Sequence, residues 1–365
     1  MTDVRASLRK IEFPAVVYEA LRQMQKLLTN EARSPTYAHV AKEISDEFIF
    51  NDCDRRGNPR RRKLSAVREL QIIEVIASTL QSTKPDMCQK IFFILFPTAD
   101  PTVMESRITI ISRLVSLAIA LKSQNTLNCA GFWMHVCGCT SELSLTVVQH
   151  VVGDYFNLIP TSADRMKELA GISPLFCASM ATSLTHMTQA NPAVEVIELL
   201  ATWVRAQPFL CFTPMEAIPP QLYTQCLQTF LPGLMTWCVL APVTASHSNL
   251  SPEMLAKQNE LYSYLHYALL EMLIRASQVT PRAPMVLTFL PTLYVLQVAD
   301  TLKRIANPNA KSTELALNRL GQILQAAFTS KCIHGNMDAM FQMLKQLPPN
   351  RLLRIILSRW ETKKY

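Results

Sequence analysis

Glycine is scarce in this chain, and its scarcity narrows the choice of fold class. Eight of the 365 residues are glycine, about 2%, where soluble proteins average near 7%. Strand turns and phosphate-binding loops both depend on glycine. The 22 prolines fall mostly between apolar runs, where proline starts and stops helices. Together these counts favour a chain built of helices.

Charged residues are also few, and half of the net positive charge lies in one short segment. Charged residues make up 18% of the chain and apolar residues 49%, which suggests that much of the surface is apolar or covered by partners. The net charge is +8. The stretch "NDCDRRGNPRRRKLS" holds six bases against Asp52 and Asp54, a local +4, so the rest of the chain carries only the other +4. A near-neutral body excludes a surface built throughout for phosphate.

Long apolar runs and a secretory leader are missing as well. No run reaches the roughly 18 residues of a membrane span, and "MTDVRASLRK" is charged from its third residue, unlike a signal peptide. The ten cysteines lie mostly inside apolar helical patterns. We expect reduced, buried thiols in an intracellular protein without membrane contact.

Motifs for catalysis are absent from the sequence: no glycine-rich phosphate loop, no G-x-S-x-G and no H-E-x-x-H occurs. The best metal candidate is "CAGFWMHVCGC", with Cys129, His135, Cys137 and Cys139. Its spacing matches no common zinc pattern. We interpret these thiols as buried apolar groups beside Trp133, which with Trp203 and Trp237 is expected to anchor the core.

An acidic trio is the second candidate for chemistry. Glu43, Asp46 and Glu47 stand at helical i, i+3 and i+4 spacing, which suits a cation or acid–base work. No second carboxylate set or histidine accompanies them, so we interpret the trio as a solvated face that the following basic loop neutralises. We therefore expect no enzyme, no metal and no cofactor.

Helix starts are frequent. A capping side chain precedes proline at four places, Asp100-Pro101, Ser173-Pro174, Asn191-Pro192 and Ser251-Pro252. In "PTVMESRITIISRLVSLAIAL" two apolar stripes follow helical spacing while Arg107 and Arg113 point elsewhere, so this helix must pack on two sides.

The series of such segments predicts the fold class. We expect roughly fifteen to eighteen helices joined by short turns, stacked as an all-α, irregular HEAT-like helical-repeat array, or α-solenoid. A compact all-α globule stays open as the alternative. The polar stretch 241–254 suggests an N-terminal array over 1–243, which contains the basic loop at 51–64, and a C-terminal helical region over 244–365.

The basic loop is the one segment with a specific functional signal. Gly57-Asn58-Pro59 in its middle interrupts any helix. We interpret the bases as an import signal or a contact for an acidic partner. The alternatives are a merely solvated loop and a nucleic-acid-binding helical repeat that uses 55–63, although a lone basic loop binds nucleic acid weakly at physiological salt. The candidate residues are Arg55, Arg56, Arg60, Arg61, Arg62 and Lys63.

Several segments, taken in order, resemble one family. "SDEFIF" and the basic loop are followed by "LSAVRELQIIEVI", "ESRITIISRLVSLAIAL", "VVGDYFNLIPTS", "ISPLFCASMATSLT", "LPGLMTWCVLAPV", "ELYSYLHYALLEML" and "LPPNRLLRIILS". The opening "MTDVRASLRK" is similar too. In this order, over nearly the whole chain, they resemble the Integrator complex subunit 15 family.

The resemblance implies a non-catalytic scaffold in the nucleus. It implies membership of the Integrator complex, which processes small nuclear RNA 3′ ends and terminates RNA polymerase II transcription. The expected partners are other Integrator subunits, above all subunits 10, 13 and 14, with the polymerase machinery reached indirectly and no direct nucleic-acid contact. Vertebrate relatives carry a longer basic insertion where this chain has "TASHSNLSPEMLAKQN", and a further tail beyond the point matching Tyr365, so the roles of those segments do not carry over.

Overall fold

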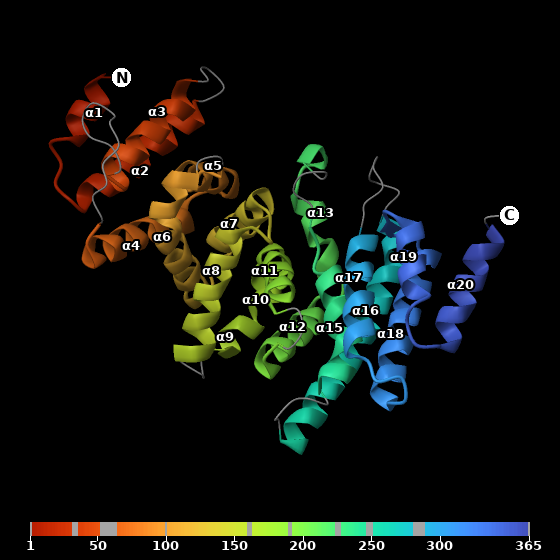
Figure 1. The fold of residues 1–365 in the computed structure, drawn as a ribbon. Coiled ribbons are helices and arrows are strands. Elements are labelled where there is room, and N and C mark those ends of the chain that lie inside the picture. The colour runs from red at the N-terminus through yellow and green to blue at the C-terminus, as the bar shows by residue number, and fades with distance from the viewer. Residues whose placement is uncertain are drawn as a thin grey trace. The chain divides into compact units, whose positions relative to one another are not determined.

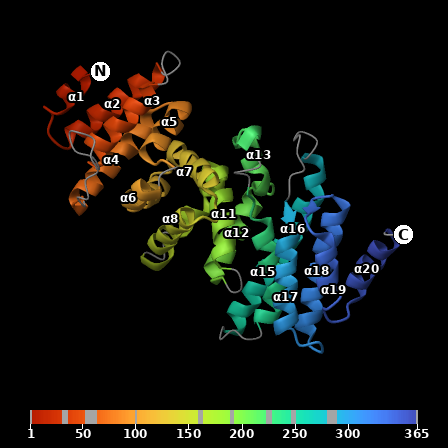
Figure 2. The same cartoon turned by 45° about the horizontal axis from the view of Figure 1, so that its top comes forward.

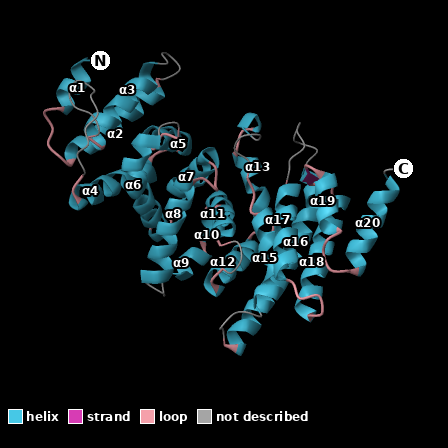
Figure 3. Cartoon of the chain, viewed as in Figure 1, coloured by secondary structure: helices cyan, strands magenta, loops and turns pink. Residues whose placement is uncertain are grey.

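Helices account for almost all of the structure that is described. A computed structural model of the chain describes residues 2–30, 36–51, 64–98, 101–158, 163–188, 192–222, 228–245, 251–279 and 289–363. Within these ranges the elements are helical except for a two-residue parallel pairing of β1 (Leu290–Pro291) with β2 (Ile333–His334) (Figure 1, Figure 3). The predicted all-α helical-repeat class is confirmed.

The chain folds into two compact units, Met1–Phe176 and Cys177–Tyr365, and the boundary falls inside α11 (Pro174–Met187). The helices of the first unit are α1 (Thr2–Leu8), α2 (Ala15–Thr29), α3 (Thr36–Ile44) with the π-helical turn Ser45–Ile49, α4 (Ala66–Ser82), α5 (Pro85–Leu95), α6 (Pro101–Ala120), α7 (Gln124–Cys137), α8 (Glu142–Val152) with the π-helical turn Gly153–Leu158, α9 (Ala163–Lys167) and α10 (Leu169–Ile172).

The second unit is also built almost entirely of helices. Its helices are α12 (Val194–Ala206), α13 (Thr213–Ala217), α15 (Leu231–Thr244), α16 (Pro252–Val279), α17 (Thr292–Ile305), α18 (Lys311–Thr329), α19 (Met337–Leu344) and α20 (Arg351–Lys363), with 3-10 turns at Leu210–Phe212 and Pro220–Leu222. Figure 2 shows α15, α16, α17 and α18 side by side.

Proline and its capping neighbour fix several helix starts. Helices α6, α11 and α16 begin at the prolines predicted to start them, Pro101, Pro174 and Pro252. Ser173 Oγ accepts a hydrogen bond from the backbone N–H of Phe176 at 3.4 Å, which satisfies one of the free donors of a first turn. At the fourth predicted start, α12 begins at Val194, two residues after the proline, and Asn191 lies outside the described residues.

The cores form around the tryptophans and around one helix that is apolar except for two threonines. Trp133, Trp203 and Trp237 are buried, as predicted, and the indole N–H of Trp133 donates to the carbonyl of Phe96 at 2.9 Å. In the second unit, α15 contacts α16, α17 and α18 and is buried on every side. A helix surrounded in this way needs apolar residues all round.

The boundary expected at residue 243 stays a prediction. The described part of that stretch ends at residue 245 and resumes at 251, and α15 packs against α16 across it. Limited proteolysis would test whether 1–243 and 244–365 separate as stable fragments. Among the described residues, no helix combines the length and the apolar stretch that crossing a bilayer requires.

Candidate interaction surfaces

The six bases of the predicted contact, Arg55, Arg56, Arg60, Arg61, Arg62 and Lys63, lie outside the described residues, so their role stays a prediction. The structure does describe the two ends of the loop. Asn51 and Leu64 both line a cavity of about 250 Å³, together with Arg9 and Arg68. Asn51 has a φ of 56°, a left-handed conformation that asparagine tolerates better than most residues, and it follows Phe50, the C-cap of the π-helical turn. Glu47 lines the same cavity and pairs with Arg9, so Arg68 carries the remaining positive charge at the place where the two ends of the loop meet the fold.

The acidic trio is tied into the fold by arginines. Glu43 pairs with Arg5 of α1, and Glu47 pairs with Arg9 at 2.9 Å. The side chain of Glu47 is only 12% exposed, so the interpretation of the trio as a solvated face was wrong for this residue. These carboxylates link α1 to the end of α3 and to the turn that follows it.

The third carboxylate, Asp46, meets a buried cation. Arg107 of α6 is 1% exposed and donates to Asp46 Oδ1 at 2.7 Å and to the carbonyl of Leu95 at 2.7 Å. Its guanidinium also lies 3.9 Å from the centre of the Phe50 ring, within the range of a cation–π contact. The expectation that Arg107 points away from the packed faces was wrong, because these partners compensate the cost of burying its charge.

The cysteine cluster does not converge on a metal geometry. Cys129 and His135 lie on α7, and Cys139 follows the turn at Gly138, whose φ is 88°. Cys139 Sγ lies 3.4 Å from His135 Nδ1. Burial raises the pKa of the Cys129 thiol to about 12, which disfavours the thiolate that would bind metal or act as a nucleophile. Across the described residues, no three potential ligands gather around one point.

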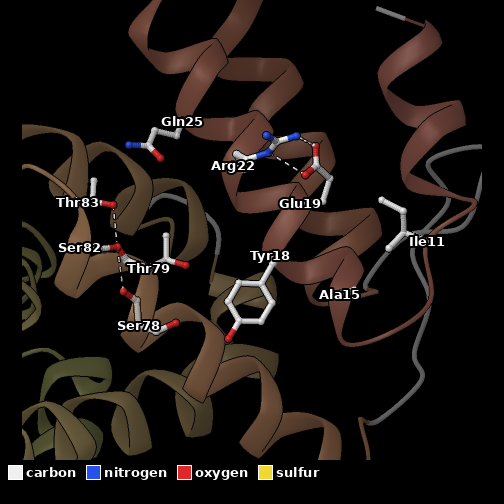
Figure 4. A pocket seen from close by; sticks show the side chains of 10 residues that line it. All are labelled: Ile11, Ala15, Tyr18, Glu19, Arg22, Gln25, Ser78, Thr79, Ser82 and Thr83. Carbon is white, nitrogen blue, oxygen red and sulfur yellow. Dashed lines mark hydrogen bonds and ion pairs between the residues drawn. The ribbon is translucent and has the colours of Figure 1, made fainter.

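A groove of about 640 Å³ lies between α2 and α4 in the first unit (Figure 4). Figure 4 shows Arg22 and Glu19 turned toward each other on α2 and the hydroxyl residues of α4 across the space from Tyr18. The Arg22 guanidinium donates to both Glu19 oxygens at 2.8 and 2.9 Å. This hydrogen bonding lowers the pKa of the Glu19 carboxyl below its usual value.

The hydroxyl protons of the groove are used within α4. Thr79 donates to the carbonyl of Val75 at 2.8 Å, and Thr83 donates to that of Thr79 at 2.7 Å. Ser82 also donates to a carbonyl of its own helix. A nucleophilic hydroxyl needs a base within hydrogen-bond reach, and here the protons point to the backbone instead. The groove thus offers acceptor oxygens and an aromatic face, which suit contact with another macromolecule.

Sequence reasoning missed both the groove and the role of Arg107. Their parts come from helices far apart in the chain; Arg107 and Asp46, for example, are 61 positions apart. Tyr18 did carry a signal, because it is an aromatic residue off the buried stripe of α2 and remains 49% exposed. Single exposed aromatic residues are common on soluble proteins, so this signal alone does not identify a contact surface.

The fold defines a class, an all-α helical-repeat protein, and the described residues form grooves between its helices. Comparison with known proteins makes the class specific. The model of the family described as Integrator complex subunit 15 matches residues 2–349. The chain belongs to this family, and the resemblance found in its segments is confirmed.

Individual relatives agree with the family match. Integrator complex subunit 15 of Mus musculus is 28% identical over 98% of this chain and 87% of its own length. The Danio rerio protein of the same name is 28% identical over 98% of this chain and 81% of its own length. The Drosophila melanogaster protein is 24% identical over 97% of this chain and 95% of its own length. The similarity therefore extends over both units.

Proposed function

We propose that the chain is a non-catalytic scaffold subunit of the nuclear Integrator complex. In this role it joins the arm of subunits 10, 13 and 14 to the rest of the complex, and so serves small nuclear RNA 3′-end processing and termination of RNA polymerase II transcription. The observation that carries the proposal is the family match over residues 2–349.

The physical basis of the role is a stiff helical scaffold with contact points. HEAT-like stacking of helices holds rows of side chains at fixed spacing, and the buried Arg107 and Trp133 bonds tie neighbouring helices together. Large apolar side chains remain on the surface, among them Val67 at 65% and Tyr267 at 67% exposure. Residues of this kind anchor protein interfaces when a partner covers them.

The basic loop extends the proposal to import or to an acidic contact. Replacing all six bases of 55–63 by alanine should leave the thermal unfolding midpoint unchanged, because exposed loop charges rarely hold a core. The same variant should lose nuclear accumulation or an acidic partner, which fluorescence microscopy and co-purification would show. A clear drop in thermal stability would contradict placing these residues in a contact loop.

Affinity purification of the tagged full chain from nuclear extract tests the scaffold role. Mass spectrometry at moderate and at high salt should recover Integrator subunits in both, because a largely apolar interface resists salt. Recovery of RNA alone, lost at high salt, would contradict the proposal.

The second candidate function is nucleic-acid binding through 55–63, favoured by the density of bases there. It predicts an affinity for RNA whose logarithm falls with the logarithm of salt at a slope of roughly −4 to −6 if all six bases touch phosphates. A filter-binding series with the six-alanine variant as control separates the two functions.

A further inference from the structure

We propose that the groove between α18 and α20 binds an acidic segment of a partner protein and takes one of its apolar side chains as an anchor. The inference goes beyond the scaffold role, because that role assigns no ligand to the surface formed by α18 and α20. It concerns the chemistry of one surface and holds whichever complex supplies the segment.

The two helices touch at one end and leave a space at the other. Asn350 Nδ2 donates to Asn318 Oδ1 at 2.8 Å. One turn further, Gly321 faces Leu352 so closely that a Cβ on Gly321 would lie 2.8 Å from Leu352 Cδ2. Beyond this contact a cavity of about 480 Å³ opens between the helices, and Arg359 lies on its lining.

The lining of this cavity is a stack of three aromatic rings from three helices. The rings of Phe328 (α18) and Phe341 (α19) are 5.7 Å apart and 11° from parallel, and those of Phe341 and Trp360 (α20) are 4.5 Å apart and 14° from parallel. Phe341 is buried, while Phe328 and Trp360 are half-buried. Rings held in this way present a rigid apolar wall to an incoming leucine, isoleucine or phenylalanine.

Helix α20 carries positive charge that no carboxylate of the described chain neutralises, and Arg359 brings this charge to the lining of the cavity. Arg351, Arg354 and Arg359 are exposed on α20, and none of them has an ion pair among the described residues. Some other surface cations of the second unit do have one, as Arg304 has with Asp300 at 3.2 Å. The acid of α20, Glu361, is already paired with Lys345 at 2.7 Å.

This charge selects an acidic occupant. Three such arginines attract a segment with the opposite charge and set its register. Ile355, 42% exposed, lies among them on the same helix and adds apolar contact area. Three arginines on a near-neutral body would hold nucleic acid only weakly at physiological salt, so the combination favours a protein segment that is both acidic and apolar.

Trp360 provides a local reporter for a test. The other three tryptophans, Trp133, Trp203 and Trp237, are at most 1% exposed. In the full chain labelled with 5-fluorotryptophan, fluorine NMR therefore separates an event at the groove from events elsewhere. The probes are peptides selected from a random library on the unlabelled full chain, and an oligouridylate RNA.

The expected result has three parts. The selected peptides carry aspartate or glutamate around a leucine, isoleucine, phenylalanine or tryptophan, and they shift the Trp360 resonance. Arg359→Glu weakens their binding by about tenfold, since it reverses a charge at the cavity. The matched control Lys311→Glu makes the same charge change at the opposite end of α18 and leaves the affinity unchanged. Arg359→Gln, which removes the charge without reversing it, repeats the test if Arg359→Glu alters folding.

Other results would overturn the proposal. Selected peptides that are basic, that leave the Trp360 resonance in place, or that bind the Arg359→Glu variant as tightly as the natural chain exclude an acidic ligand in this groove. An RNA probe that moves the resonance where no peptide does assigns the surface to nucleic acid instead. Neither result would affect the scaffold role, which the co-purification tests separately.

Discussion

Arg107 shows how a single buried charge can join three segments of a helical unit. Its guanidinium meets a carboxylate after α3, a carbonyl at the end of α5 and a phenylalanine ring. A shorter side chain would leave Asp46 and the Leu95 carbonyl without this donor. Loss of one partner of a buried pair is costly because the other keeps its desolvation penalty.

Arg107→Ala should accordingly lower the free energy of unfolding of the first unit by about 3 kcal/mol. The matched control is Arg113→Ala on the same helix, whose pair with Glu69 at 2.9 Å is more exposed and should be worth less than about 1 kcal/mol. Urea unfolding followed by circular dichroism measures both. Equal losses in the two variants would show that the buried Arg107 contributes no more to stability than the exposed Arg113 does.

His266 makes the stability of the second unit depend on pH. Burial lowers the pKa of His266, and the nearby charge of Arg319 adds to the effect. The ring Nε2 lies 2.8 Å from Gln322 Oε1, while Nδ1 is buried without a partner in the described part of the chain. A protonated ring would therefore carry a second N–H that nothing accepts.

The direction of the pH effect follows from this lowered pKa. Below about pH 6.5, the usual histidine value, the unfolded chain binds a proton that the folded chain does not, so stability falls as the pH falls. His266→Gln should reduce this dependence between about pH 7 and pH 5. Unfolding midpoints measured at several pH values test this prediction. If the midpoint of His266→Gln depends on pH as steeply as that of the natural chain, His266 is not the cause.

At the scale of elements, the closeness of α18 and α20 rests on Gly321. An alanine there would place its Cβ 2.8 Å from Leu352 Cδ2 and 2.9 Å from its Cγ, closer than packed atoms approach. Gly321→Ala should destabilise the second unit by about 1–3 kcal/mol, as overpacking does, and should change the fluorescence of Trp360. Gly171→Ala, with no atom within 4 Å of the new Cβ, is the control. Natural stability and fluorescence in the Gly321→Ala variant would mean that α20 moves freely.

The elements also show where sequence reasoning succeeds. The starts at Pro101, Pro174 and Pro252 were predictable, because a cap and a proline act within one turn. The burial of the tryptophans was predictable from apolar periodicity. The burial of Arg107 was not, because a pattern on one helix cannot reveal a carboxylate 61 residues away. The aromatic stack could not be predicted either, since its three rings come from three different helices.

For the whole chain, two observations bear on function: the match to the family and the apolar side chains that remain exposed. The chain has few charged residues and keeps large apolar side chains on its surface, which agrees with the scaffold role that we propose. The basic loop and the α20 arginines place positive charge in two separate segments of the chain. An acidic partner region at each would let one scaffold bind two neighbours.

The bridge between the subunit 10, 13 and 14 arm and the rest of the complex is the central claim. The most direct test removes this chain from nuclear extract and purifies the complex through subunit 10. The account predicts that subunits 13 and 14 remain bound while the rest of the complex is lost, and that adding back the full chain restores it. Recovery of the whole complex without this chain would contradict the bridging role.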